Sequence, residues 1–295
     1  MNLLNKKERE RYMDEFKIEA YGKINLALDV VGRRNDGYHD LNTIMQQIDL
    51  KDIITIKSRE KGIKIECNIP EVPLNSSNLV YNAWDKMKEK SGLDRGAHII
   101  IEKNIPVASG LAGGSTNAAA VLKGLNKLWR LNLSNEELMD IGVSIGADVP
   151  FCIVGGIALA KGIGEKLETL SSFSNKFILL ANPGMPVSTT HVYEKLNIDG
   201  IKKKPNMDML VQAVENDDLY FLAKNMENVL EEVTIKEFKE IKTIKEDMIK
   251  YGAIGSLMSG SGPTVFGIFD NEKDLIRCKN KLEKKVDKVI ITKTI

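Results

Sequence analysis

The segment that most clearly indicates the fold of this chain is Pro106-Val107-Ala108-Ser109-Gly110-Leu111-Ala112-Gly113-Gly114-Ser115-Thr116. Its glycines permit positive φ angles and a close approach of the backbone to a ligand. A helix-forming stretch, 118–129, follows directly, so exposed N–H groups and the positive end of a helix dipole point at one place. The pattern predicts a phosphate-binding loop, with hydroxyls from Ser115 and Thr116. The alternative is a flexible turn that only joins a strand to a helix.

This loop is not one of the two common nucleotide-binding motifs. No Gly-Lys-Ser/Thr follows it, which excludes a Walker A loop, and glycines at 110, 113 and 114 do not fit G-x-G-x-x-G. A second glycine-rich turn, Ser259-Gly260-Ser261-Gly262-Pro263, precedes an apolar strand pattern over 264–269. By itself it indicates a tight entry into a strand or a second phosphate contact. Beside the first loop it favours phosphate binding.

Outward from these loops, the apolar pattern alternates between strand and helix periods. Even spacing of apolar residues predicts a strand over 16–31, and β-branched residues predict a hairpin formed by 52–57 and 62–67. Helices are predicted over 75–90 and, behind the capping box Ser134-Asn135-Glu136-Glu137, over 135–145. The second half is more helical, with an apolar stripe formed by Ile235, Phe238, Ile241, Met248 and Ile249. Hairpins mixed with helices predict an α+β fold.

The domain division is predicted from length and local composition. The 295 residues suffice for two domains, and a connection is marked by the polar residues Ser171, Ser172, Ser174 and Asn175. We therefore expect an N-terminal domain over 14–170 and a C-terminal domain over 171–295. Residues 1–13 are charged and lack a signal-peptide core, so they are interpreted as a frayed or loosely docked extension, or as a start assigned ahead of Met13.

Composition argues against several classes of protein. The chain holds 42 Lys+Arg and 41 Asp+Glu, a net charge of +1, whereas nucleic-acid binders usually carry a basic excess. The three cysteines, Cys67, Cys152 and Cys278, are widely spaced, which disfavours a disulfide framework or a structural zinc site. A reducing, cytoplasmic setting fits best. No apolar run approaches the length that crosses a bilayer.

Taken together, the motifs resemble those of the GHMP kinase superfamily. The first loop resembles the P-x-x-x-G-L-G-x-S-S/T signature, 259–264 resembles the C-terminal glycine-rich motif, and Ala20-Tyr21-Gly22-Lys23-Ile24-Asn25-Leu26 resembles the N-terminal motif. The resemblance extends from about residue 17 to 270. It implies a two-domain fold with a ribosomal-protein-S5-like N-terminal domain and a ferredoxin-like C-terminal domain. It also implies that ATP, as the phosphoryl donor with Mg²⁺, binds at 106–116.

Within the superfamily, three elements resemble the kinases that phosphorylate the 2-hydroxyl of 4-diphosphocytidyl-2-C-methyl-D-erythritol in non-mevalonate isoprenoid precursor biosynthesis. They are 23–26 followed by Arg33-Arg34-Asn35-Asp36-Gly37-Tyr38-His39, then Gly146-Ala147-Asp148-Val149-Pro150-Phe151, and then 155–156 ahead of 162–165. Homoserine and mevalonate kinases are not expected to carry the Asp-Gly-Tyr-His element. The chain departs from the usual pattern at Gly22, at Lys161 and at Ala112. Ala112 replaces a usual glycine, so that position requires an ordinary φ or a small local adjustment.

The resemblance implies that Lys23 and Asp148 form the catalytic pair. Asp148 would accept the proton of the acceptor hydroxyl late in phosphoryl transfer, and an ion pair with Lys23 would favour its ionised form. From sequence alone, Asp148 is more simply an N-cap. Lys23 alone is more simply a lysine on a solvent-facing strand position.

The remaining implied site residues bind the acceptor. Tyr38 and Tyr193 would enclose the cytosine, His39 would hydrogen-bond to the base, and Asn25 and Thr189 would contact the polyol phosphate. Without the resemblance, Tyr38 and His39 are simply a surface tyrosine and a turn histidine. No protein metal site is expected, since the histidines are not spaced as ligands and Mg²⁺ arrives with ATP.

The sequence therefore predicts an ATP-dependent small-molecule kinase that binds a cytidine diphosphate substrate, without a nucleic-acid or membrane partner, as a monomer or homodimer. A GHMP enzyme acting on another alcohol is the nearest alternative. A nucleotide-binding regulator that lost turnover is disfavoured because Lys23 and Asp148 are present. An RNA-binding protein of related topology is disfavoured by the net charge and the phosphate loop.

Overall fold

The computed structural model describes residues 15–295, so the predicted extension over 1–13 lies outside the described residues. The chain divides into two compact units. Within the described residues, unit 1 holds 15–20, 51–107 and 114–153, and unit 2 holds 21–50, 108–113 and 154–295. Both units mix helices with strands, as predicted. Each unit is formed by separate segments that alternate along the chain, whereas the predicted domains 14–170 and 171–295 are each continuous. The predicted division at residue 170 stays a prediction.

The sheet of unit 1 is built from the end of β2 (His39–Arg59), β4 (Gly96–Glu102) and β3 (Ile63–Cys67). β4 lies between the other two, antiparallel to β2 and parallel to β3. The predicted hairpin of 52–57 and 62–67 is therefore wrong. After β3 the chain passes through α2 (Leu79–Ser91) before it returns as β4, which is the crossover that parallel strands require. β4 is central because it pairs along both edges, and it buries Ala97, Ile99 and Ile101.

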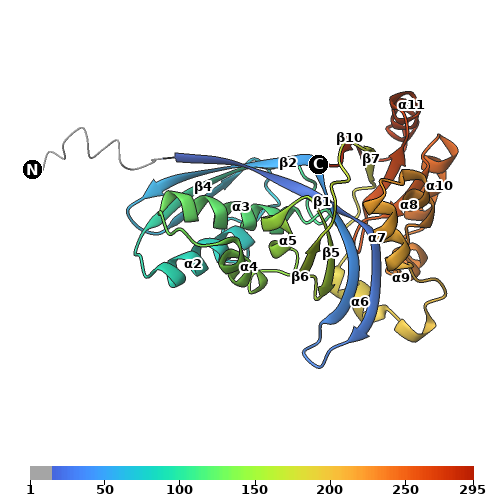
Figure 1. The fold of residues 1–295 in the computed structure, drawn as a ribbon. Helices are drawn as coiled ribbons and strands as arrows, with labels where there is room; N and C mark the ends of the chain where they lie inside the picture. Colours follow the sequence, from blue (N-terminus) through green and yellow to red (C-terminus); the bar gives the residue numbers. More distant parts are fainter. Residues whose placement is uncertain (1–14) are drawn as a thin grey trace, which may run out of the picture. The chain divides into compact units, whose positions relative to one another are not determined.

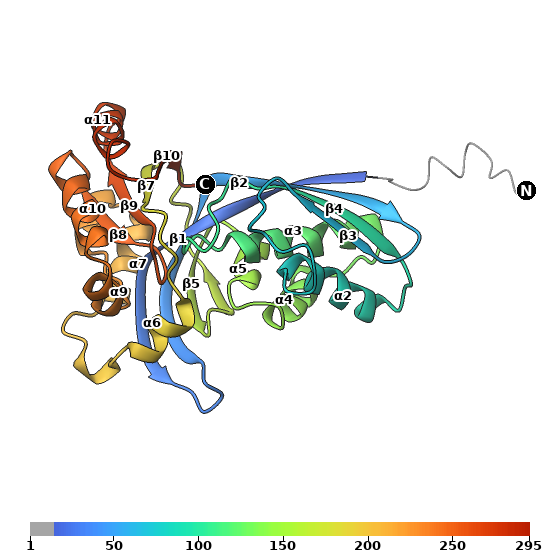
Figure 2. The ribbon, with the colours of Figure 1, turned by 180° about the vertical axis from the view of Figure 1, so that it is seen from behind.

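Four helices cover unit 1. In both views they lie on one side of the strands β2, β3 and β4 (Figures 1 and 2). The predicted capping box is confirmed: Ser134 Oγ accepts from Glu137 N, and the Glu137 carboxylate accepts from Ser134 N. A Cβ built on Gly124 of α3 (Gly113–Leu128) would lie 2.3 Å from Cδ1 of Ile56, so α3 packs on β2 as closely as a glycine allows. The helices are α2, α3 (Gly113–Leu128), α4 (Asn135–Val143) and α5 (Val149–Val154).

Unit 2 contains two sets of paired strands. The first joins β1 (Glu15–Arg33) to β2, β2 to β5 (Ile157–Gly162), and β5 to β6 (Lys166–Thr169); β1 and β2 also contribute residues to unit 1. The second is an antiparallel four-stranded sheet in the order β10-β7-β9-β8. Its strands are β7 (Phe177–Asn182), β8 (Gly255–Met258), β9 (Val265–Phe269) and β10 (Lys288–Lys293).

The helices of unit 2 pack on this second sheet and beside the hairpin of β1 and β2. α10 contacts β8 and β9, and α11 contacts β7 and β10. α6 lies beside the hairpin in both views (Figures 1 and 2). These elements are α6 (Thr189–Lys195), the 3₁₀ turn η1 (Ile198–Gly200), α7 (Met207–Glu215), α8 (Leu219–Asn225), α9 (Glu231–Glu237), α10 (Lys239–Lys250) and α11 (Glu272–Leu282). None of the helices within 15–295 is long and apolar enough to span a membrane.

The apolar stripe predicted over 235–249 is partly wrong. The helix is interrupted at Phe238, between α9 and α10, and the buried residues of α10 are Ile241, Ile244 and Met248. Ile249 is 50% exposed. Because α10 begins anew at residue 239, its buried face is set independently of α9. This face contains Ile241, Ile244 and Met248, which are three and four residues apart, and Ile249 points away from the core.

Candidate active site

β1 carries two buried polar residues on one face. Lys23 and Asn25 are 4% and 1% exposed, and alternation along a strand puts both side chains on the same side. Lys23 Nζ donates to Asn25 Oδ1 at 2.7 Å, and Asn25 Nδ2 donates to Thr43 Oγ1 at 2.9 Å. Thr43 Oγ1 donates onward to the carbonyl oxygen of Ala27 at 2.6 Å. This chain of bonds fixes the orientation of the amide, and Lys23 is not the solvent-facing lysine of the simpler interpretation.

The middle of the predicted phosphate loop, residues 106–116, lies against β1. The carbonyl oxygen of Leu111 accepts from Lys23 N at 3.1 Å. Gly110 has φ 77°, and Ala112 has φ 56°. The expectation of an ordinary φ at Ala112 is therefore wrong: the alanine adopts the left-handed conformation that the usual glycine reaches without strain. α3 begins at Gly113, inside the predicted loop and earlier than expected.

A buried carboxylate secures both ends of the phosphate loop within unit 1. Asp52, fully buried, accepts from the backbone N–H groups of Asn104 and Ile105 at 2.7 and 2.8 Å, just before the loop begins. It also accepts from Nδ2 of Asn117 on the first turns of α3 at 2.8 Å. Lys103 Nζ donates to it at 2.5 Å, and burial lowers the pKa of this lysine while Asp52 opposes that shift. The carboxylate therefore ties the entry of the loop to its exit.

Sequence reasoning missed Asp52, although a signal was present. Asp52 shares its strand face with Ile54 and Ile56, and all three are fully buried. An acidic residue in phase with inward-facing isoleucines requires a partner.

The second glycine-rich turn meets the first loop inside unit 2. Ser259 Oγ donates to the carbonyl oxygen of Gly110 at 2.9 Å. A Cβ built on Gly110 would lie 2.2 Å from the carbonyl oxygen of Ser259, so only glycine fits there. On the other side of the turn, the hydroxyls of Ser261 and Thr189 are 2.9 Å apart. The turn therefore touches both the loop and a residue predicted to bind the acceptor.

α6 presents Thr189 and Tyr193, which lie one turn apart on the same face. The ring of Tyr193 contacts that of His39, with centroids 5.2 Å apart and planes at 34°. His39 is 9% exposed, and burial, with a further contribution from Arg33, lowers its pKa below the ordinary value. Its imidazole is therefore neutral near pH 7 and can donate or accept a hydrogen bond. Tyr38 is 56% exposed and offers an open ring face.

Asp148 immediately precedes α5 in unit 1, and its carbonyl oxygen accepts from Cys152 N at 3.1 Å. Its segment lies beside the first turn of α3, since a Cβ built on Gly146 would lie 3.7 Å from Ser115 Oγ. Asp148 thus stands directly before a helix, which is the position that the simpler N-cap interpretation gives it. Asp148 and Lys23 belong to different units, so their pairing stays a prediction.

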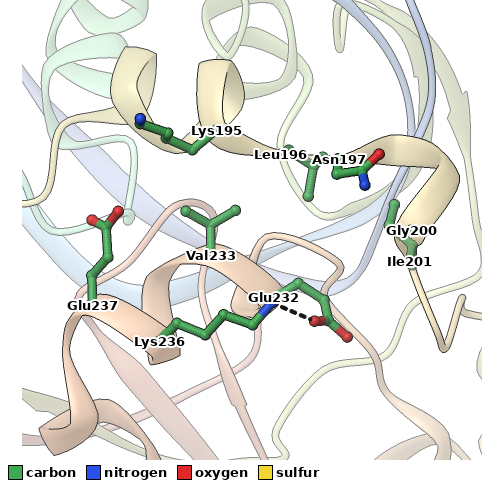
Figure 3. A pocket seen from close by; sticks show the side chains of 9 residues that line it. All are labelled: Lys195, Leu196, Asn197, Gly200, Ile201, Glu232, Val233, Lys236 and Glu237. Atoms are coloured by element: carbon green, nitrogen blue, oxygen red, sulfur yellow. Dashed lines mark ion pairs between the residues drawn. The ribbon is translucent and has the colours of Figure 1, made fainter.

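A separate pocket of about 280 Å³ lies between α9 and the segment from the end of α6 to η1 (Figure 3). Lys195, Lys236, Glu232 and Glu237 give it a balanced charge. Lys236 and Glu232 form an ion pair at 3.2 Å, drawn as a dashed line in Figure 3. The predicted site residues do not line this pocket, and its balanced charge does not suit a triphosphate. Across 15–295, no three His, Cys, Asp or Glu side chains gather as a metal site would require.

Comparison with known proteins gives consistent matches along the chain. Residues 78–156 match the model described as the GHMP kinases N-terminal domain, and 210–288 match the GHMP kinases C-terminal model. A protein of Clostridium beijerinckii named 4-diphosphocytidyl-2-C-methyl-D-erythritol kinase is 50% identical over 279 residues, covering 95% of this chain and 100% of that protein. A protein of the same name from Alkaliphilus metalliredigens is 51% identical, covering 88% of this chain and 89% of its own.

Solved structures are similar over the same extent. A crystal structure of 4-(cytidine 5'-diphospho)-2C-methyl-D-erythritol kinase superposes with a TM-score of 0.80 at 29% identity, covering 95% of this chain and 99% of that one. The homoserine kinase of Cytophaga hutchinsonii superposes with a TM-score of 0.77 at 17% identity, covering 100% of this chain and 97% of that one. At that identity the likeness shows a shared fold.

Proposed function

The chain belongs to the GHMP kinases and, within them, to the 4-diphosphocytidyl-2-C-methyl-D-erythritol kinase family, and from this membership we propose its reaction and the residues that perform it. The reaction transfers the γ-phosphoryl group of ATP, which enters with Mg²⁺, to the 2-hydroxyl of 4-diphosphocytidyl-2-C-methyl-D-erythritol. This is a step of non-mevalonate isoprenoid precursor biosynthesis. The relatives' names and the coverage of their full length support the substrate.

One observation carries the placement of the reaction. The buried Lys23–Asn25 pair on β1 lies against both glycine-rich segments: Lys23 N donates to Leu111 O, and a Cβ on Gly260 would be 3.6 Å from Asn25 Oδ1. A buried ammonium beside two loops rich in backbone N–H groups suits a transferring phosphoryl group. A lysine used only for solubility would be exposed.

We assign ATP to residues 106–116. The backbone of Ala108–Gly113 and the N-terminal turn of α3, with Ser115 and Thr116, would hold the phosphate oxygens. Phosphoryl transfer has a loose transition state, so the main tasks are to align the two substrates and to stabilise charge. The new bond joins the acceptor oxygen to the γ-phosphorus, the bond from the γ-phosphorus to the β–γ bridging oxygen breaks, and ADP leaves.

Two side chains serve the acceptor hydroxyl. Asp148 accepts the proton that the hydroxyl loses as the new bond forms, and Lys23 stabilises negative charge near the transferring group. Asn25, oriented by Lys23 and Thr43, contacts the polyol near the reacting hydroxyl. Thr189 on α6 contacts the phosphate part of the acceptor.

The cytidine end is assigned to Tyr38, His39 and Tyr193. The neutral imidazole of His39 would hydrogen-bond to the edge of the base, and the exposed ring of Tyr38 would stack on one of its faces. Tyr193 supplies the second face, since it reaches the same hairpin from α6 and contacts His39.

A panel of acceptors tests the substrate. Purified protein with MgATP is offered the cytidine-diphospho-methylerythritol, mevalonate and homoserine, and the product is located by ³¹P NMR. The proposal expects turnover of the cytidine compound, with a new phosphomonoester at the 2-position. Turnover of mevalonate or homoserine alone would leave the GHMP fold intact and overturn the substrate assignment.

A further inference from the structure

The second glycine-rich turn, 259–262, sits at the centre of the candidate site in unit 2. Ser259 Oγ donates to Gly110 O in the phosphate loop, and Ser261 Oγ is 2.9 Å from Thr189 Oγ1 on the acceptor side. A Cβ built on Gly260 would lie 3.3 Å from Gly110 O and 3.6 Å from Asn25 Oδ1. Four consecutive residues thus span the distance from the donor side to the acceptor side. A shift of this turn would move both sides.

The buried side chain of Asn228 holds this turn in place. Asn228 is 3% exposed, and its Nδ2 donates to the carbonyl oxygens of Met258 and Gly260, both at 2.8 Å. Its Oδ1 accepts from Leu230 N at 3.0 Å, which fixes which end of the amide faces the turn. Only an amide can donate twice on one side and accept on the other in this space.

The backbone around Asn228 is attached to β1. Leu28 N donates to Glu227 O at 2.9 Å, and Val229 N donates to Leu28 O at 3.0 Å. β1 is the strand that carries Lys23 and Asn25. Asn228 therefore connects the strand of the predicted phosphoryl-transfer residues directly to the turn that touches both substrate sides.

Neighbouring side chains hold the same turn. Glu231, one turn further on, accepts from Met258 N at 2.9 Å, and Thr234 Oγ1 donates to Ser261 O at 3.3 Å. Asn228, Glu231 and Thr234 all come from the start of α9 and the segment before it. Such support points to a turn whose position matters, beyond a simple entry into β9.

We propose that Asn228 is a positioning residue of the reaction: by fixing the turn 259–262 on β1, it sets the distance between the γ-phosphoryl group and the acceptor hydroxyl. This inference rests on the proposed function, because it takes the phosphate loop as the donor side and Thr189 as the acceptor side. Each substrate keeps its own contacts when the turn loosens, whereas their alignment is lost. A misplacement of about 1 Å can cost roughly a hundredfold in rate.

The test compares Asn228→Asp, Asn228→Ala and Leu282→Ala. Aspartate keeps the acceptor for Leu230 N but replaces the two donations to the turn with repulsion between oxygens. Leu282, a fully buried residue of α11, is a control for loss of stability away from the turn. We expect kcat to fall about ten- to a hundredfold in both Asn228 variants, with Kd for ATP and for the acceptor within about threefold of wild type. Leu282→Ala should lower Tm and leave kcat near wild type.

Three results would overturn the inference. The first is an Asn228→Asp variant with wild-type kcat, because Asn228 would then act only by capping Leu230. The second is a loss confined to the Kd values. The third is a kcat loss that Leu282→Ala reproduces at equal Tm.

Amide hydrogen exchange separates this inference from the proposed function. Exchange over 257–264 and 108–113 should rise in Asn228→Asp and stay unchanged in Leu282→Ala. If the wild type ignores the cytidine acceptor, the proposed function fails, and exchange alone decides whether Asn228 holds the turn. Unchanged exchange in Asn228→Asp would then contradict the inference.

Discussion

Lys23 Nζ donates a 2.7 Å hydrogen bond to Oδ1 of Asn25, and this bond between two buried residues of one strand orders the centre of the candidate site. The lysine fixes the oxygen end of the amide, so the Nδ2 end must find its partner on the other side. Thr43 on β2 supplies it at 2.9 Å. The orientation of Asn25 therefore depends on a hydroxyl that need not touch a substrate.

Replacing Thr43 with valine should disorder Asn25. The change keeps the shape of the side chain but leaves Asn25 Nδ2 and Ala27 O without their hydroxyl partner, at a cost of about 1–3 kcal/mol. We expect kcat/KM for the acceptor to fall about tenfold, as measured by steady-state kinetics. Thr43→Ser keeps the hydroxyl and is the matched control. Equal kinetics for the two variants would show that this hydroxyl does not orient Asn25 for the reaction.

Restoring glycine at position 112 should stabilise the protein. Ala112 has φ 56°, where an L-residue costs about 1–2 kcal/mol relative to its ordinary conformation and glycine does not. For a chain of this size, about 1 kcal/mol corresponds to a rise in Tm of roughly 2–4 °C. Differential scanning calorimetry of Ala112→Gly measures it. Ala118→Gly, in the interior of α3, should lower Tm instead, because glycine weakens a helix. A lower Tm for Ala112→Gly would contradict the inference that the backbone is strained at Ala112.

Neutralising Asp52 should be strongly destabilising, and removing its partner as well should restore part of the loss. Asp52→Asn leaves the ammonium of Lys103 buried without a counter-charge, at a cost of about 3–5 kcal/mol. The double variant Asp52→Asn/Lys103→Met removes that charge, while the asparagine oxygen can still accept from the backbone of 104 and 105. Urea denaturation of both variants gives the comparison. A double variant less stable than Asp52→Asn would show that the ion pair does not dominate.

Acceptor binding should weaken in acid through His39. Burial, then Arg33, lowers its folded pKa below the ordinary 6.5, so as the pH falls the unfolded state takes up the proton first. The folding stability that depends on the neutral imidazole is thus complete above about pH 6.5. It is lost as the pH falls from there to the lowered pKa of the folded state. Calorimetric Kd of the cytidine acceptor without ATP should be flat from about pH 8 to 6.5 and rise only as the pH approaches the lowered pKa of His39 in the folded protein. In His39→Gln the acid rise should vanish; its persistence there would assign it to another group.

The fold could be predicted from the sequence because its patterns are local, and the same patterns supplied the site residues, which stay a prediction. The capping box at Ser134, the strand around Lys23 and both glycine-rich segments are visible in the order of residues. The matches at the N- and C-terminal halves and the superposition on a family member confirm the two-domain GHMP kinase fold. The kinase prediction is confirmed by the relatives at about half identity.

The features that could not be predicted from the sequence depend on contacts between segments that are distant along the chain. The placement of β4 between β2 and β3 is a matter of strand pairing, and β-branched runs alone do not state their partners. The bond between Ser259 and Gly110 joins residues 149 positions apart. Asn228 looks like an ordinary polar residue before a helix until its amide is seen to hold the turn. The positive φ of Ala112 likewise follows from the loop's surroundings and not from the alanine.

The most direct test of the account is kcat with the cytidine-diphospho-methylerythritol and saturating MgATP for wild type and Asp148→Asn. The asparagine is nearly isosteric but accepts a proton far less readily, and loss of a positioned base costs about a hundred- to ten-thousandfold. We predict measurable turnover by the wild type and a fall of that size in the variant, with Kd for both substrates little changed. A variant that turns over at the wild-type rate would contradict the assignment of Asp148 as base. A wild type that does not phosphorylate this acceptor would contradict the proposed reaction itself.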